Sequence, residues 1–465
     1  MGRSFRPIVP VAAVVFALLV VVPPPLAMSA GARSRPSSRV GPGVFSNSVK
    51  RGAKIIDKLL KKLAEKGRKE LVMDKSADSV PLFVFNLTVG TSSPPQNIPG
   101  VLDINGQLVW SQCSPCSPCL PAPAPAFEPD RSSTFARLPC GSQTCQQVLN
   151  DTYTCSGNAA GDDRCKYTYM SESTNTTGYL ANDTFTFGDT PVPGLVFGCS
   201  DAFLQGDLSG ASGSFGLSRG PLSLVSQLKL SWFSYFLASD DDESDDSSRI
   251  QFGGDAAPPQ TKNSRSTPLL NSTLYPDLYS VKLTGVRVDG NDLAADIPAG
   301  TFDFQANGSG GVFLSTTYPL TVLEQAAYDA VRKAIAGSIT AAQPVDGSAI
   351  GLDLCYTMQS LKSVTIPKLA LVFDGDDAVM DLKRYNYLFA DNDTGLECLS
   401  IMPYTGLSLL GSLVQTGIEM TYDIDNARLI FDTTAAQTTA AASPAAHSLA
   451  TMMLLYHLAV WVVLF

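Results

Sequence analysis

Residues 310–323 read Gly-Gly-Val-Phe-Leu-Ser-Thr-Thr-Tyr-Pro-Leu-Thr-Val-Leu, and this stretch decides the fold. Its counterpart, residues 101–106, reads Val-Leu-Asp-Ile-Asn-Gly. In both stretches an apolar strand leads directly into a turn, and the two lie in different halves of the chain. The sequence therefore predicts an internal repeat, with one such strand and turn in each half of the chain.

The composition is that of a globular protein built mainly from β-strands. The chain has 465 residues, 45% of them apolar and 16% charged, and exceeds the usual size of one hydrophobic core. Short runs of Val, Ile, Phe, Thr and Tyr end at Gly, Pro or Asn, and few long helical patterns occur. We therefore expect a mostly β fold with two or more packed units.

The N-terminus has the pattern of a secretory signal peptide. Arg3 and Arg6 precede an apolar run from Ile8 to Val22, and small residues follow three prolines. We assign residues 1–30 to this signal and expect a secreted protein. An uncleaved membrane anchor is the alternative interpretation.

Charge is distributed unevenly along the chain. The first 78 residues carry 15 Lys and Arg against 5 Asp and Glu, whereas the remainder carries 18 against 38. Within the basic segment 31–78, apolar residues after Lys50 have helical spacing. A pro-segment over an acidic cleft and a solvated helix are both open interpretations. Because the remainder is strongly acidic, we expect no nucleic-acid partner.

The C-terminus has the pattern of a lipid-attachment signal. No charged side chain follows Asp432, and small residues lead into a largely apolar tail from Leu449 to Phe465. Residues 433–465 therefore predict a GPI anchor at the cell surface. A tail anchor or a plain hydrophobic end is the alternative, because the tail is at the short limit for a spanning helix.

The ten cysteines predict disulfides, since a signal peptide leads to an oxidising compartment. Eight lie in the first half, and their pairing stays open, whereas Cys355 and Cys398 are expected to pair. The spacing Cys113-x-x-Cys116-x-x-Cys119 also suits a metal, but disulfides fit secretion better, so we expect no metal and no cofactor. Seven glycosylation sequons fit the same compartment, at Asn86, Asn150, Asn175, Asn182, Asn271, Asn307 and Asn392.

Several classes of chemistry are excluded for the folded body. The only histidines, His447 and His457, lie in the tail, so Ser-His-Asp and Cys-His catalysis and histidine-based zinc sites have no imidazole there. The glycines of residues 210–216 do not have the order of a phosphate-binding loop. The acidic run 240–246 is interpreted as a solvated loop. Carboxylate chemistry remains available for hydrolysis.

Further fragments have an informative order. Residues 83–91 read Phe-Val-Phe-Asn-Leu-Thr-Val-Gly-Thr, a cysteine-dense insert covers 113–165, and residues 422–431 read Tyr-Asp-Ile-Asp-Asn-Ala-Arg-Leu-Ile-Phe. Together with the two turns, they resemble the plant nepenthesin-like branch of the pepsin-type aspartic protease family. The resemblance runs from about residue 80 to residue 431 and implies the bilobal pepsin-like fold. In that fold two β-barrel-like lobes, residues 79–230 and 231–432, meet at a central cleft with one turn from each lobe at its floor.

The resemblance implies roles for four residues. Asp103 occupies the position of the first catalytic aspartate, whereas Ser315 stands where the family has the second one. Tyr169 occupies the position of the flap tyrosine that closes over substrate, and Trp110 belongs to the first active-site loop. The resemblance thus places Asp103 and Ser315 in the catalytic centre and assigns Tyr169 and Trp110 to substrate binding.

The chemistry of this family needs both acids. Two carboxylates about 3 Å apart share a proton, so the ionised one activates water while the protonated one polarises the scissile carbonyl. A serine hydroxyl holds water but is no base at acid or neutral pH. Loss of one member of a cooperating set costs on the order of 10⁴-fold in rate. Ser315 therefore predicts a catalytically impaired homologue.

Other turn residues also depart from the family. Ile104 replaces a Thr whose hydroxyl links the two turns, and Gly106 and Tyr318 replace small hydroxyl residues that hydrogen-bond the carboxylates. Asn105 and Thr317 replace glycines. Asn tolerates positive φ better than a β-branched residue does, so Thr317 is the harder one to accommodate if the turn requires it.

The leading hypothesis is a monomeric homologue that captures peptides or proteins in its cleft without turnover. One alternative is an active acid endopeptidase that uses Asp103 with Ser315 or another acid, although Asp303 is expected to point away. A second alternative is an inhibitor-like binding protein for a cell-wall hydrolase, since the resemblance extends to plant xylanase inhibitors. A third is a structural cell-surface glycoprotein.

Overall fold

The computed structural model describes residues 69–75, 82–120, 124–148, 152–155, 163–170, 174–206, 208, 210–239, 247–254 and 257–434. The predicted signal peptide, the basic segment up to residue 68, the acidic run 240–246 and the tail from residue 435 lie outside the described residues. The hypotheses about them stay predictions. In the described part of the chain, no helix combines the length and apolarity needed to span a bilayer.

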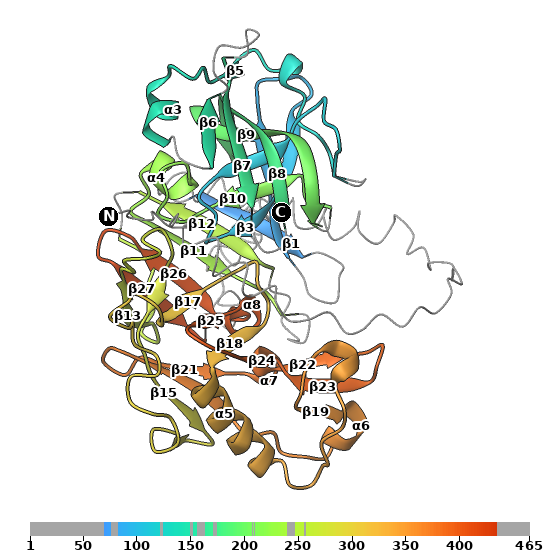
Figure 1. Ribbon diagram of the computed structural model, residues 1–465, viewed down its shortest axis with the longest axis vertical. Helices are drawn as coiled ribbons and strands as arrows, with labels where there is room; N and C mark the ends of the chain where they lie inside the picture. The colour runs from blue at the N-terminus through green and yellow to red at the C-terminus, as the bar shows by residue number, and fades with distance from the viewer. Residues whose placement is uncertain are drawn as a thin grey trace, which may run out of the picture.

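The fold is mostly β and has two lobes, which confirms the predicted class (Figure 1). In Figure 1 the first lobe lies at the top, the second at the bottom, and shared strands run between them. The first lobe contains strands β2 (Phe83–Val89), β3 (Gln96–Asp103), β4 (Val109–Gln112), β5 (Ala136–Arg137), β6 (Tyr153–Cys155), β7 (Cys165–Met170), β8 (Thr174–Phe187), β9 (Thr190–Gly206) and β10 (Gly213–Gly216). Its short helices are η1 (Pro129–Arg131), α3 (Gln143–Val148) and α4 (Leu224–Leu228).

The second lobe carries more helix, including the amphipathic α5. Its strands are β14 (Ser280–Val281), β15 (Leu283–Val288), β16 (Asn291–Asp292), β17 (Val312–Leu314), β18 (Thr321–Glu324), β19 (Cys355–Thr357), β20 (Leu369–Phe373), β21 (Val379–Leu382), β22 (Leu388–Asp391), β23 (Leu396–Leu399), β24 (Ile401–Tyr404) and β25 (Ser408–Leu410). Its helices are α5 (Gln325–Ser338), η2 (Ser348–Ile350), α6 (Met358–Leu361), α7 (Arg384–Tyr387) and α8 (Ser412–Gln415).

A sheet between the lobes holds them together. It contains β1 (Lys69–Lys75), β11 (Trp232–Phe236), β12 (Arg249–Gly253), β13 (Arg265–Leu270), β26 (Glu419–Asp423) and β27 (Arg428–Asp432). Strand β1 pairs antiparallel first with β12 and then with β2, so one strand joins the sheet between the lobes to the sheet of the first lobe. This strand lies inside the segment 31–78 that the sequence assigns to the pro-segment.

The internal repeat is visible in the strand pairing. In the first lobe β3 pairs in parallel with β10, and in the second lobe β17 pairs in parallel with β25. The first pairing places Asp103 opposite Gly216, and the second places Leu314 opposite Leu410. A short buried strand thus lies beside each turn strand, and a glycine, Gly216 or Gly411, stands at or directly after its end.

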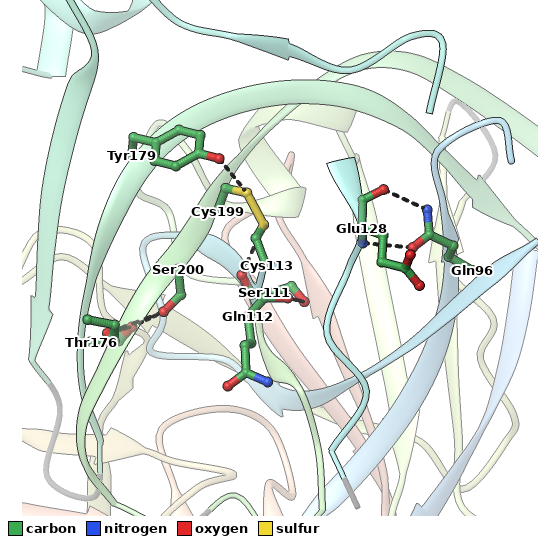
Figure 2. Close-up of a disulfide and its surroundings, with 10 residues drawn as sticks. Gln96, Ser111, Gln112, Cys113, Glu128, Thr176, Tyr179, Cys199 and Ser200 are labelled. Atoms are coloured by element: carbon green, nitrogen blue, oxygen red, sulfur yellow. Dashed lines mark hydrogen bonds between the residues drawn. A yellow bond between two sulfur atoms is a disulfide. The ribbon is translucent and has the colours of Figure 1, made fainter. Parts of the chain in front are cut away.

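Five disulfides use all ten cysteines. The predicted bridge Cys355–Cys398 is confirmed. Cys113 and Cys199 join the end of the first active-site loop to β9, and the hydroxyl of Tyr179 lies 3.4 Å from the Cys199 sulfur (Figure 2). The other three pairs are Cys116–Cys119, Cys140–Cys155 and Cys145–Cys165.

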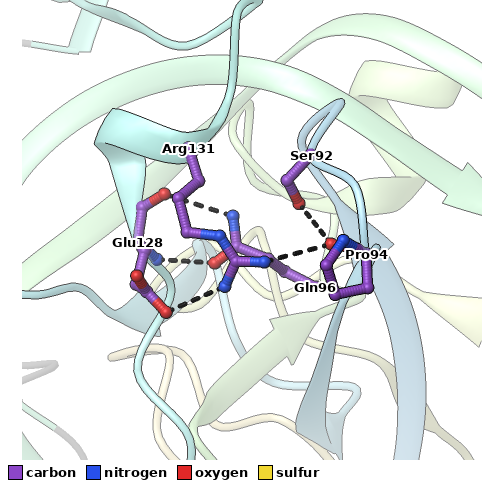
Figure 3. A network of polar contacts seen from close by, with 5 residues as sticks. All are labelled: Ser92, Pro94, Gln96, Glu128 and Arg131. Carbon is purple, nitrogen blue, oxygen red and sulfur yellow. Dashed lines mark hydrogen bonds and ion pairs between the residues drawn. The ribbon is translucent and has the colours of Figure 1, made fainter.

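A polar network anchors the loop that precedes η1 (Figure 3). The side-chain amide of Gln96, on β3, donates to the Glu128 carbonyl at 3.1 Å, and the Glu128 N–H donates back to it at 2.8 Å. Arg131 pairs with the Glu128 carboxylate at 2.9 Å and donates to the Pro94 carbonyl at 3.2 Å. These contacts hold part of the cysteine-dense insert against the strand that carries Asp103.

The close approach of β10 and β4 depends on a missing side chain at Gly213. A Cβ there would lie 2.0 Å from the Trp110 carbonyl oxygen and 2.7 Å from the Ser111 Cα, both backbone atoms that cannot rotate away. We expect Gly213→Ala to lower the free energy of unfolding by about 1–3 kcal/mol, the usual cost of overpacking. Denaturant titration measures it.

The matched control is Gly337→Ala, in α5, where no neighbouring group of the described residues lies within 4 Å of the added methyl. Alanine should there stabilise the helix by about 0.5–1 kcal/mol. If both variants changed stability in the same direction, steric contact at Gly213 would not be the cause.

Candidate active site

Asp103 is the last residue of β3, and its buried carboxylate has two donors on each oxygen. Oδ1 accepts hydrogen bonds from the backbone N–H groups of Asn105 at 3.0 Å and Gly106 at 2.9 Å. Oδ2 accepts from the hydroxyls of Tyr169 at 3.1 Å and Ser214 at 3.3 Å. The carboxylate is therefore fully paired, as a buried polar group should be.

Burial raises the pKa of the Asp103 carboxyl above its ordinary value. Its four hydrogen bonds favour the ionised form and oppose this shift without cancelling it. In the part of the chain that the structure describes, none of the groups that shift this pKa is a second carboxylate. The raised pKa is thus an effect of desolvation and not of a shared proton.

Ser315 follows β17 and takes the corresponding place in the second lobe. Its hydroxyl accepts a hydrogen bond from the backbone N–H of Tyr318, three residues further on, at 3.1 Å. Asp103 Oδ1 accepts from Gly106 with the same spacing. The second turn therefore holds the Ser315 hydroxyl as the first turn holds a carboxylate oxygen.

Hydrogen bonds across the lobe boundary join the two turns. The Thr316 hydroxyl donates to the Leu102 carbonyl at 2.7 Å and accepts from the Ile104 N–H at 3.3 Å. Ile104 has no hydroxyl that could make the reciprocal bond from the first turn to the second. The Asn105 side-chain amide makes this bond and donates to the Leu314 carbonyl at 2.9 Å. The link that the resemblance implies for residue 104 is therefore made by its neighbour Asn105.

Ser214 is a functional residue that the sequence analysis missed. Gly106 offers no hydroxyl to Asp103, and a Cβ at Gly106 would lie 2.6 Å from Asp103 Oδ2. Ser214 lies on β10 opposite Val101, and its hydroxyl reaches the carboxylate from the neighbouring strand. The sequence signal for this role was a serine within the buried strand Gly213–Gly216, which begins and ends with glycine.

The two residues that stand where the family has glycine cause no backbone strain. Asn105 and Thr317 both have φ outside the positive range, so neither turn requires the left-handed conformation at these positions. The steric difficulty anticipated for Thr317 does not arise. Its hydroxyl lies 3.4 Å from that of Ser315.

Tyr169 lies on β7, the first strand of the predicted flap, and contacts Asp103. Its ring centroid is 6.2 Å from that of Trp110, whose buried indole N–H has no hydrogen-bond partner among the described residues. Burial, followed by the nearby Asp103 charge, raises the pKa of Tyr169 well above its ordinary value, so its hydroxyl remains a donor. The structure thus brings Asp103, Tyr169 and Trp110 together.

The buried side-chain amide of Gln415 holds the backbone of the second turn by hydrogen bonds. Gln415 Nε2 donates to the carbonyls of Ser315 at 2.8 Å and Gly411 at 3.0 Å. Its Oε1 accepts from the hydroxyl of Tyr235, which belongs to the sheet between the lobes. The position of the Ser315 backbone is therefore coupled to that sheet.

Asp303, considered as a replacement acid, does not contact Asp103. It is exposed, and its carboxylate lies 3.8 Å from the Lys282 ammonium. Among the described residues, no group of three His, Cys, Asp or Glu side chains is arranged to hold a metal ion. The described site therefore combines one carboxylate with several hydroxyls.

Comparison with known proteins identifies this arrangement. Family models described as Xylanase inhibitor N-terminal and Xylanase inhibitor C-terminal match residues 83–254 and 278–433. Aspartic proteinase nepenthesin-2 of Nepenthes gracilis is 35% identical over 356 residues, which are 75% of this chain and 76% of that protein. Nepenthesin-1 of the same plant is 33% identical over 75% of this chain and 77% of its own length. Protein ASPARTIC PROTEASE IN GUARD CELL 2 of Arabidopsis thaliana is 32% identical over 73% of this chain and 70% of its own length.

Solved structures support the fold. The crystal structure of edgp matches with a TM-score of 0.64 at 20% identity, covering 80% of this chain and 96% of that one. Basic 7S globulin from soybean matches with a TM-score of 0.60 at 20% identity, covering 79% and 96%. The fold and the paired turns define a pepsin-type aspartic protease homologue. Within that class, the chain belongs to the plant nepenthesin-like family.

The link between the turns can be tested at Thr316. Thr316→Val keeps the shape but leaves the Leu102 carbonyl and the Ile104 N–H without their buried partner. We expect the free energy of unfolding to fall by about 1–3 kcal/mol. Chemical denaturation measures this, with Thr317→Val, one residue along the same turn, as the control that changes little.

The pH dependence of stability tests the environment of Asp103. Because its pKa is higher in the folded chain than in the unfolded chain, the folded chain holds the proton more tightly. The stabilisation from Asp103 is therefore complete at low pH and is lost as the pH rises above about 3.9, the unfolded value. We expect Asp103→Asn to unfold at a higher temperature than the wild type at pH 7, with the gain shrinking towards pH 3.

The same substitution at Asp189, which is exposed, is the control. Its unfolding temperature should follow that of the wild type across the pH range. A gain for Asp103→Asn that stayed constant from pH 3 to pH 7 would contradict a desolvated carboxylate.

Proposed function

We propose that this protein is a catalytically impaired aspartic protease homologue that captures peptide or protein segments at the Asp103–Ser315 site. The observation that supports it most is the single carboxylate, whose raised pKa comes from burial and not from a second acid. Without that acid, no protonated carboxyl polarises a scissile carbonyl while another activates water. Turnover should be lower by on the order of 10⁴-fold.

The remaining groups suit capture of an extended peptide. Asp103 accepts hydrogen bonds, and the hydroxyls of Ser214, Ser315 and Tyr169 both donate and accept. Peptide N–H and carbonyl groups are the complementary partners. In this proposal Tyr169 leaves Asp103 when a ligand binds, and its hydroxyl accepts from the indole N–H of Trp110.

Two other functions have specific support. Relatives at 31–35% identity carry names of aspartic proteases, which favours an active acid endopeptidase. The matching family models are described as xylanase inhibitor domains, which favours an inhibitor-like partner of a cell-wall hydrolase. The hydroxyl at Ser315 argues against the first, and the test below separates the two.

The protein's location and assembly are part of the proposal. Five disulfides are typical of an oxidising, extracellular environment. The proposed protein is monomeric and glycosylated, enters the secretory pathway through residues 1–30 and is held at the cell surface by a GPI anchor formed from the tail.

Peptide turnover tests the proposal directly. Purified protein that begins at Lys69, so that β1 is kept, is assayed with a fluorogenic peptide at pH 3–5, and its retention on a statine-type inhibitor column is recorded. We expect retention without cleavage for the wild type. Ser315→Asp should raise cleavage by on the order of 10²-fold, part of what the second acid supplies.

Ser315→Asn is the matched control, because it has the size of aspartate without the acid. It should stay inactive. Wild-type cleavage that a statine-type inhibitor blocks and Asp103→Asn abolishes would establish an active endopeptidase. Binding of a xylanase without retention on the inhibitor column would favour the inhibitor-like function.

A further inference from the structure

We propose that the disulfide Cys116–Cys119 is a thiol–disulfide exchange site that reacts with dithiols. Three features carry this inference: the exposure of the pair, the short loop that it closes, and the backbone hydrogen bonds that hold this loop independently of the sulfurs. The proposal is independent of the Asp103 site.

The pair is the most exposed of the five disulfides in the described part of the chain. Cys119 is exposed and Cys116 is half-buried, and the intervening residues are exposed as well. Exchange begins when a thiolate reaches a sulfur, so access directs the attack to Cys119. Both cysteines of three other pairs are buried, and those of Cys140–Cys155 are half-buried.

The disulfide closes the shortest loop in the molecule. Its cysteines are 3 residues apart, whereas the separations of the other pairs are 15, 20, 43 and 86. A cross-link stabilises a fold by restricting the unfolded chain, and this restriction grows with loop length. Opening Cys116–Cys119 therefore removes less stability than opening any other pair.

Hydrogen bonds keep the loop in place without the disulfide. The Ser117 N–H donates to the Asp201 carbonyl and the Phe203 N–H donates to the Pro118 carbonyl, both at 2.8 Å. At the end of the loop, the Leu120 N–H donates to the Gln112 side chain. The loop is thus docked on β9 at two points between the cysteines, which keeps the sulfurs close enough to reclose.

The exchange is balanced in atoms and electrons. One thiolate of the dithiol attacks the Cys119 sulfur, forms a mixed disulfide and releases Cys116 as a thiolate, which takes up a proton. The second thiolate of the dithiol then attacks the other dithiol sulfur, which is bonded to Cys119 in the mixed disulfide. Cys119 leaves as a thiolate and is protonated. Two electrons and two protons pass from the dithiol, which becomes a cyclic disulfide.

The test is selective reduction of the full folded chain. Protein is titrated with dithiothreitol at pH 8 without denaturant, quenched with N-ethylmaleimide and mapped by mass spectrometry. We expect Cys116 and Cys119 to be alkylated at a dithiothreitol concentration at least tenfold below that needed for any other pair. Amide hydrogen exchange at Ser117 and Phe203 should stay slow in this reduced form.

Variants identify the attacked sulfur. Incubated with oxidised glutathione, Cys116→Ser should form a mixed disulfide at Cys119 faster than Cys119→Ser forms one at Cys116. Cys140–Cys155 is the internal comparison in the wild type, so the result does not depend on the variants folding. Opening of all five pairs together, prior opening of Cys140–Cys155, or fast amide exchange throughout the first lobe after reduction would overturn the proposal.

Discussion

Hydrogen bonds between the two turns are the constraint on which the rest of this structure depends. Thr316 and Asn105 each reach across the lobe boundary to a backbone carbonyl that directly precedes the opposite site residue. Each bond fixes the end of a strand, and each strand is backed by a parallel partner in its own lobe. Asp103 and Ser315 therefore lie at strand ends that the side chains of Thr316 and Asn105 tie to the opposite turn, whatever their own side chains are. These links do not involve the Ser315 side chain, so the joining of the turns does not depend on a carboxylate at that position.

The altered residues around the site form a consistent set. Ile104 and Gly106 lack the hydroxyls that the family uses, but Asn105 supplies the link between the turns and Ser214 supplies the donor to Asp103. A buried carboxylate without its donors would be costly, so these contacts are what permits Asp103 to stay charged in the interior. The departures from the family thus leave a well-ordered site around one acid, which is the condition that a binding function requires.

The sequence alone predicted the two lobes, the paired turns and the positions of Asp103 and Ser315, because these follow from local strand patterns and from a resemblance carried by short fragments. The roles of Ser214 and Asn105 could not be predicted in this way. Ser214 is 111 residues from Asp103, and only the pairing of β10 with β3 brings its hydroxyl to the carboxylate. From the sequence, Asn105 was interpreted only by the backbone φ that the turn might require. In the structure its side-chain amide points across the lobe boundary and binds the Leu314 carbonyl. Contacts set by tertiary register leave no periodic signal in the chain.

The environment of Asp103 also determines how the site responds to pH. In a carboxylate pair, repulsion splits the two pKa values and keeps one group charged and the other neutral over a range of acid pH. Asp103 has no such partner among the described residues, and burial is the largest cause of its shift. Among the described residues, Asp103 therefore titrates without a coupled second acid. A ligand that donates a hydrogen bond to Asp103 favours the charged form and lowers this pKa, so binding of such a ligand would depend on pH.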